Sequence, residues 1–114
     1  MRNHRQTEAE REAGLAARIT TQFRDHRSMV YELDCGTAKL ALTMSDAPPH
    51  GGLWQAGASV RHADSAPALS ASGPSRGEAL SAVAAEWQKL GERAGYPHLD
   101  WTAIRAALVA VRAV

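Results

Sequence analysis

The sequence predicts a single α+β domain in which helices pack on one face of an antiparallel sheet. Apolar residues recur every three or four positions near both ends of the chain, which is typical of helices. Between these segments they recur every second position, which is typical of half-buried strands. Clusters of proline and glycine separate the segments. We expect the order αββββαα, with three to four strands, over residues 7–114, after a flexible basic tail at residues 1–6.

The composition is that of an ordinary globular domain. At 114 residues the chain is long enough to form one core without disulfides or metals. The formal net charge is +1, so the chain lacks the strongly basic character of a dedicated nucleic-acid binder. The single cysteine, Cys35, excludes an internal disulfide, and no apolar run is long enough to cross a membrane. We therefore expect a cytoplasmic protein with no membrane partner.

A first helix is predicted from about Glu8 to about His26. Thr7 and Glu10 have the spacing of a capping box, in which the two side chains satisfy backbone N–H groups of the first turn. Its buried stripe would consist of apolar residues four positions apart, namely Leu15, Ile19 and Phe23.

A β-hairpin is predicted where the segments MVYELD and TAKLALTM flank Cys35 and Gly36. If these two residues form the turn, the facing pairs are Leu33 with Ala38, Tyr31 with Leu40, Met29 with Leu42, and, on the opposite side, Glu32 with Lys39. A longer loop with Gly36 at a bulge is the alternative, because cysteine is not favoured in the tight turn.

Two further strands follow the proline-containing loop from Ser45 to Gly52. The segment LWQAGASVRH alternates between an apolar face and a polar face that includes Gln55 and Arg61. Its apolar face consists of Trp54, Ala56, Ala58 and Val60. Residues 68–72, ALSAS, are predicted to form a short last strand.

A second helix is predicted from Ser75 to Ala94. Ser75 and Glu78 have capping-box spacing, and Gly95 is placed to end the helix. The apolar stripe of this helix consists of Leu80, Val83, Trp87, Leu90 and Ala94.

A last helix is predicted from Trp101 to about Arg112, with Asp100 as its N-cap. Its apolar stripe consists of Trp101, Ile104, Leu108 and Val111. The chain would therefore end in two helices that pack on the sheet.

Two short patterns resemble known families. The segment ALSASGPSRGEALSAVAAEWQKL, about a fifth of the chain, is similar to the strand-to-helix junction of HicB-like antitoxins. The predicted order of a helix, a hairpin, a strand and a helix resembles that of double-stranded-RNA-binding domains. No functional residue is carried over from either family, and Arg76 is the one basic residue at the start of the helix that follows the sheet.

No catalytic, metal-binding or cofactor-binding motif is present in the sequence. The five histidines lack a short ligand spacing, and the chain has no GxSxG, P-loop or GxGxxG pattern. Trp54, Trp87 and Trp101 each lie on an apolar stripe, which favours a role in the core over a base-stacking platform. We therefore assign no catalytic residue, metal or cofactor.

The sequence favours a non-enzymatic interaction or assembly module. The last two helices are apolar beyond a single stripe, at Ala79–Ala85 and Ala106–Val114, and such surplus apolar surface favours a homodimer. One alternative is weak nucleic-acid binding through the basic face of the first helix, which would carry Arg11, Arg18, Arg24 and Arg27. Another is a small enzyme or ligand binder centred on the loop from Asp46 to Gly52, with candidate residues Asp46, His50 and His62.

Overall fold

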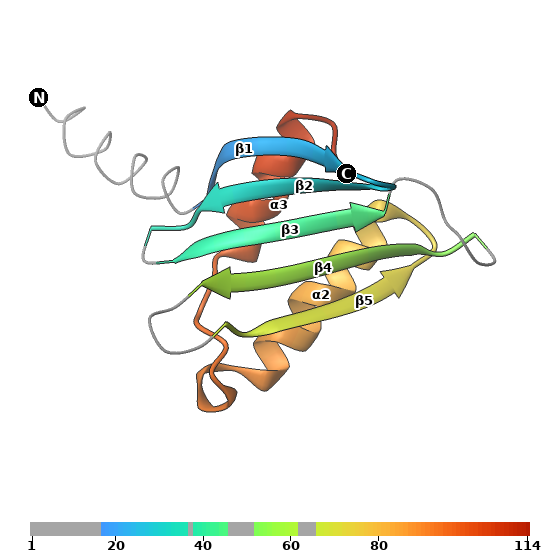
Figure 1. The fold of residues 1–114 in the computed structure, drawn as a ribbon. Helices are drawn as coiled ribbons and strands as arrows, with labels where there is room; N and C mark the ends of the chain where they lie inside the picture. Colours follow the sequence, from blue (N-terminus) through green and yellow to red (C-terminus); the bar gives the residue numbers. More distant parts are fainter. Residues whose placement is uncertain (1–16, 37, 46–51, 62–65) are drawn as a thin grey trace, which may run out of the picture.

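The computed structural model describes residues 17–36, 38–45, 52–61 and 66–114. They form an antiparallel sheet and two helices that pack on one of its faces (Figure 1). The strands are β1 (Arg18–Asp25), β2 (Ser28–Asp34), β3 (Lys39–Ser45), β4 (Trp54–Arg61) and β5 (Ala68–Gly73). The helical elements are α2 (Arg76–Leu90), the 3₁₀ turn η1 (Glu92–Ala94) and α3 (Trp101–Ala110). This confirms the α+β class, the antiparallel sheet and the two C-terminal helices.

The five strands lie side by side in the order of the chain, β1-β2-β3-β4-β5. Both helices lie on the same side of the sheet, with α2 packed against β4 and β5 and α3 in contact with β1 (Figure 1). The opposite face of the sheet carries neither helix. Both helices fall short of the length and apolarity that a transmembrane helix needs.

The predicted N-terminal helix is wrong, because Arg18–Asp25 form β1 and the observed order is βββββαα. Residues 8–16 of that prediction lie outside the described residues. The spacing of Ile19 and Phe23 by four positions fits a strand as well as a helix. The β-branched residues Ile19, Thr20 and Thr21 favour the strand, and β2 provides the hydrogen-bonding partner.

The predicted hairpin of β2 and β3 is present, but its register is shifted by two residues. Leu33 pairs with Leu40, Tyr31 with Leu42, Met29 with Met44 and Glu32 with Ala41. Lys39 therefore pairs with Asp34, and the predicted pair of Glu32 with Lys39 is wrong. A shift of two residues preserves the face on which each side chain lies, so the predicted faces are correct.

The longer loop explains the shifted register. The N–H of Cys35 donates to the carbonyl of Ala38 at 2.8 Å, and that of Gly36 donates to Asp34 Oδ1 at 3.0 Å. Gly36 has a φ of 83°, a left-handed conformation that glycine adopts without steric cost.

The helix α2 begins where the sequence predicts but ends earlier. Ser75 is its N-cap, and the Ser75 hydroxyl accepts a hydrogen bond from the Glu78 N–H at 3.1 Å. The helix ends at Gly91, which has a φ of 68°, so the predicted end at Gly95 is wrong. Leu90 is therefore 38% exposed and does not continue the buried stripe of Leu80, Val83 and Trp87.

The helix α3 begins after Asp100, as predicted, with the Asp100 carboxylate accepting from the Ala103 N–H at 3.0 Å. Trp101, Ile104 and Leu108 are buried, whereas Val111 lies beyond the helix and is 41% exposed. The placement of Val111 on the buried stripe is therefore wrong.

The core lies between the helices and the covered face of the sheet. Trp87 is its largest fully buried side chain, and its ring meets the rings of Tyr96 and Trp101 edge to face, at centroid distances of 4.8 and 5.8 Å. The Trp87 indole N–H donates to the Pro97 carbonyl at 2.8 Å. The prediction that Trp87 and Trp101 fill the core is confirmed, and Trp54 packs against it half-buried.

Candidate functional site

The face of the sheet opposite α2 and α3, which we call the open face, is the candidate site. Every second side chain of β2, β3, β4 and β5 lies on this face, as do Arg18, Thr21 and Phe23 of β1, and cross-strand pairing arranges these residues in rows. The first row runs Arg18, Asp34, Lys39, Arg61; the second runs Thr21, Glu32, Ala41, Ser59, Ala68; and the third runs Phe23, Val30, Thr43, Gly57, Ser70. Charge is thus concentrated at one end of the open face, and its middle is uncharged.

A β-bulge in β1 places Phe23 on the open face. Ile19 pairs with Leu33 and faces the helices, but the register shifts between Ile19 and Thr21. The extra residue, Thr20, donates its hydroxyl to the Glu32 carbonyl at 3.2 Å. From Thr21 onward the faces are exchanged, so Phe23 pairs with Val30 and is 43% exposed.

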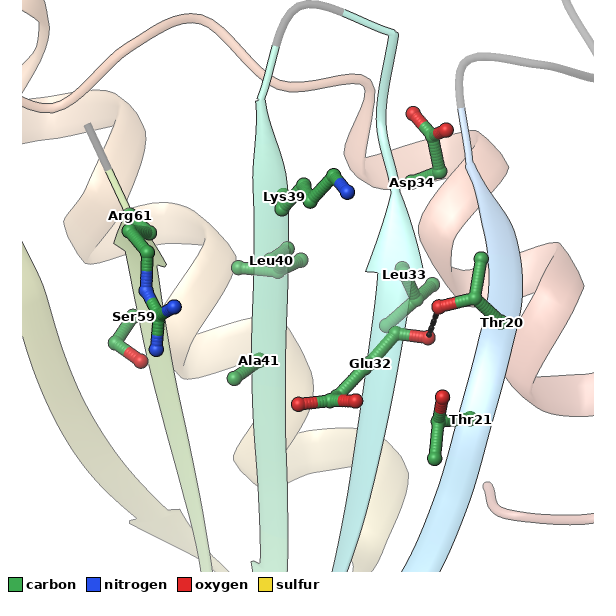
Figure 2. A pocket seen from close by; sticks show the side chains of 10 residues that line it. All are labelled: Thr20, Thr21, Glu32, Leu33, Asp34, Lys39, Leu40, Ala41, Ser59 and Arg61. Atoms are coloured by element: carbon green, nitrogen blue, oxygen red, sulfur yellow. Dashed lines mark hydrogen bonds between the residues drawn. The ribbon is translucent and has the colours of Figure 1, made fainter. Parts of the chain in front are cut away.

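The charged end of the open face forms a hollow of about 370 Å³ across β1, β2, β3 and β4 (Figure 2). Its charged lining residues are Glu32, Asp34, Lys39 and Arg61. In Figure 2 the Arg61 guanidinium lies beside Ser59, and the Glu32 carboxylate extends from the other side toward Ala41. Because alanine has a short side chain, the two charged groups project over an open floor.

Two cations face each other directly in this hollow. Lys39 pairs with Arg61 across β3 and β4, and both side chains are exposed. Like charges in directly opposed positions of a sheet are destabilising, by a few tenths of a kcal/mol up to about 1 kcal/mol. Neither cation has a carboxylate within ion-pair distance among the residues that the structure describes.

A second hollow, of about 340 Å³, continues the first along the middle of the open face. Ala41 and Ser59 line both hollows, and the second extends over Thr43, Gly57 and Ser70. A Cβ at Gly57 would lie 3.9 Å from its nearest neighbours, and the backbone there is not left-handed. Glycine is therefore not required at this position by the backbone, and its effect is to leave a trough between β3 and β5.

The arginines predicted to form a basic helix face are distributed differently. Arg18 and Arg24 lie at opposite ends of β1, and Arg27 follows in the turn to β2. Arg18 pairs with Asp34 on the open face, whereas Arg24 pairs with Met29 on the side of the helices. Arg11 lies outside the described residues. The helical geometry that was to bring these side chains together is therefore absent from the described part of the chain.

The three predicted loop residues, Asp46, His50 and His62, lie outside the described residues. Within residues 17–36, 38–45, 52–61 and 66–114, no group of three potential metal ligands is present. These ranges thus provide no donor set on which a metal site could be argued.

Cys35, the single cysteine, lies in the loop between β2 and β3 with its side chain half-buried against the core. Burial, followed by the negative charges of Asp34 and Asp100, raises the pKa of this thiol to about 11. With this pKa, Cys35 is protonated at neutral pH. Because the thiolate is the nucleophilic form, the protonated thiol is weakly reactive.

Sequence reasoning did not identify Lys39 and Arg61 as a pair. It placed Lys39 on the wet side of the hairpin and Arg61 on the polar side of the following strand, and both placements are correct. The missing information was the pairing of β3 with β4, which are separated by a loop whose length does not fix the register. The alternation of polar residues on both strands was the available signal.

Comparison with known proteins does not extend this description. No family model matches the chain, and no curated protein or solved structure is significantly similar to it.

Proposed function

We propose that this chain is a non-enzymatic interaction module whose docking surface is the open face of the sheet. The observation that carries the proposal is the direct pairing of Lys39 with Arg61. Like charges opposed in this way are unfavourable. Arg61 has no ionic partner among the described residues, and Lys39 faces Asp34 on its other side without forming a close ion pair. A partner that supplies negative charge to the hollow would convert the unfavourable pair into a favourable contact.

The apolar part of the open face supports the same proposal. Phe23 is a large side chain held 43% exposed by a bulge, next to the half-buried Val30. The trough over Gly57 lies on the other side of β3. Aromatic residues are enriched at protein interfaces, where a rigid ring contributes contact area at little entropic cost.

The helix surface is the alternative place for self-association. Ala85 and Ala106 are exposed and Val109 is 52% exposed, so α3 leaves part of this Ala-rich surface uncovered. However, Arg105 of α3 extends back to α2, where its guanidinium donates to the Gly77 carbonyl at 2.8 Å and to the Ser81 hydroxyl. The helix surface thus already makes internal contacts, whereas Arg61, at the charged end of the open face, has no ion pair with any residue that the structure describes.

Thiol labelling in cells tests the proposal. Ser70→Cys places a thiol on the exposed open face, and Thr102→Cys places one on the exposed surface of α3. Both variants also carry Cys35→Ala. With a membrane-permeant maleimide, we expect Ser70→Cys to be labelled about tenfold or more slowly in intact cells than in the purified chain at nanomolar concentration.

Thr102→Cys is the matched control and should be labelled at similar rates in the two conditions. If Ser70→Cys is labelled as fast in cells as in the dilute purified chain, the open face has no partner and the proposal is wrong.

A further inference from the structure

We infer that the partner of the open face is a second copy of this chain, docked face to face about a two-fold axis parallel to β3. This inference rests on the proposed docking role of the open face. The shape, charge and area of the open face each support it.

The shape of the open face is self-complementary. Because β3 is the middle strand, a two-fold axis along it places β2 opposite β4 and β1 opposite β5 of the second copy. The larger apolar side chains, Phe23 and Val30, lie on β1 and β2, whereas the small residues Gly57 and Ser70 lie on β4 and β5. Phe23 would face Ser70 of the second copy, and Val30 would enter the trough over its Gly57. The larger side chains of each copy would thus fill the space above the small residues of the other.

Two charged positions of the open face find an opposite charge or a polar group under the same axis, whereas Lys39, on β3, would face Lys39 of the second copy. Asp34 of one copy lies opposite Arg61 of the other in the first row, and Glu32 lies opposite Ser59 in the second row. The Arg61 guanidinium lies beside Ser59, so it would reach both carboxylates of the second copy (Figure 2). Each Arg61 thereby gains the negative partner that it lacks within the described part of its own chain.

The area of the open face is sufficient for a specific dimer. Five strands spaced about 4.8 Å apart, each about 25 Å long, give a face of roughly 600 Å² per copy. Two such faces bury about 1,200 Å² in total, at the lower end of the range for specific interfaces. We therefore expect a dimer with a dissociation constant in the micromolar range. Stacked sheets of this kind pack about 10 Å apart.

A charge-swap experiment tests this arrangement. We expect sedimentation equilibrium of the full chain at roughly 1–100 µM to show a monomer–dimer equilibrium for the unmodified protein. Glu32→Arg and Arg61→Glu should each raise the dissociation constant about tenfold or more, because each brings two pairs of like charges together. An equimolar mixture of these two variants should dimerise more tightly than either variant alone, because both contacts between positions 32 and 61 are then between opposite charges.

Rescue by mixing separates the interface from a general effect on folding, since a misfolded variant would not be restored by a second one. Glu86→Arg, on the exposed surface of α2, is the matched charge-reversal control and should leave the dissociation constant unchanged. Gly57→Val tests the shape: it should fill the trough and weaken the dimer while leaving the monomer folded.

Two results would overturn the inference. The first is that the chain is a monomer at all concentrations tested. The second is that the dissociation constant is unchanged in the open-face variants but is raised by Val109→Glu, which would place the contact on the helices. The labelling experiment separates this failure from failure of the proposed function. A monomeric chain whose Ser70→Cys is protected in cells has a different protein as its partner. If Ser70→Cys is also protected in the dilute purified chain, a segment of the same chain covers the open face.

Discussion

The two faces of the sheet are built from the same five strands, and neighbouring residues of one strand serve opposite purposes. On the covered face, Leu33, Leu40 and Leu42 are at most 1% exposed and pack against the helices. On the open face, their neighbours include Glu32, Lys39 and Thr43. The covered face therefore forms the core, whereas the open face takes no part in packing against the helices.

The faces also differ in what they contribute to stability. Burial of the leucines on the covered face contributes about 1.5–3 kcal/mol for each side chain. The open face instead carries the unfavourable pairing of Lys39 with Arg61, and it leaves Phe23 43% exposed, so this ring gains less from folding than a buried one. A face that costs stability in the free chain is the one on which a partner gives the largest gain.

The largest expected effect comes from truncating one side chain on each face of β3. Leu42→Ala removes a fully buried side chain and should lower the free energy of unfolding by about 2–5 kcal/mol. Thr43→Ala, the adjacent residue on the open face, should change it by less than about 1 kcal/mol. Urea denaturation at a concentration where the chain is monomeric measures both values. Equal losses for the two variants would mean that the open face is packed in the free chain.

A glycine on each face gives a smaller but sharper contrast. A Cβ at Gly73, at the end of β5, would lie 2.8 Å from the Ala79 backbone nitrogen and 2.9 Å from the backbone carbon of Glu78. Because backbone atoms cannot move aside easily, Gly73→Ala should destabilise the monomer by about 1–3 kcal/mol. Gly57→Ala meets only ordinary contacts and should be neutral or stabilise the strand by up to about 1 kcal/mol.

Thermal unfolding of the two alanine variants, compared with the unmodified chain, measures this difference. A loss of stability for Gly57→Ala as large as that for Gly73→Ala would contradict the description of the open face as an unfilled trough.

The covered face could be predicted from the sequence because its signals are local. The alternation of Tyr31, Leu33, Leu40 and Leu42 identifies one face of the hairpin even when the register is shifted by two. The N-caps Ser75 and Asp100 and the stripes behind them identify both helices. The strand β1 was not predicted because a spacing of four residues, as between Ile19 and Phe23, fits both a helix and a regular strand. In addition, the bulge at Thr20 places these two residues on opposite faces of the sheet, which no regular alternation indicates. A bulge is determined by the neighbouring strand and leaves no regular pattern in its own sequence.

The candidate site was less predictable because it depends on strand pairing. Lys39 and Arg61 are 22 positions apart in the sequence, and only the pairing of β3 with β4 makes them neighbours. The arginines predicted as a cluster depended on a helix, and a strand separates Arg18 from Arg24 instead. Residues on the open face do not pack against the helices, so their arrangement becomes visible only once the sheet is assembled.

The last comparison places one chemical group, a thiol, in the two environments. The raised pKa of Cys35, about 11, leaves far less thiolate at neutral pH than an exposed cysteine has. At pH 7.5 a maleimide should modify Cys35 about 100-fold or more slowly than it modifies Ser70→Cys on the open face of the monomer. The rate for Cys35 should rise about tenfold with each pH unit up to pH 10, whereas the rate for Ser70→Cys should level off above about pH 9.

The raised pKa of Cys35 also makes the free energy of unfolding decrease as the pH rises. A thiol whose pKa is raised in the folded chain favours folding fully below the pKa of the unfolded chain, about 8.5, and loses that contribution as the pH rises toward 11. Cys35→Ala should therefore remove part of the decrease in unfolding free energy between pH 8.5 and 11, as measured by urea denaturation. If Cys35 instead reacts as fast as Ser70→Cys at pH 7.5, the loop between β2 and β3 opens readily. The thiol of Cys35 would then not be protected by packing against the core at this end of the sheet.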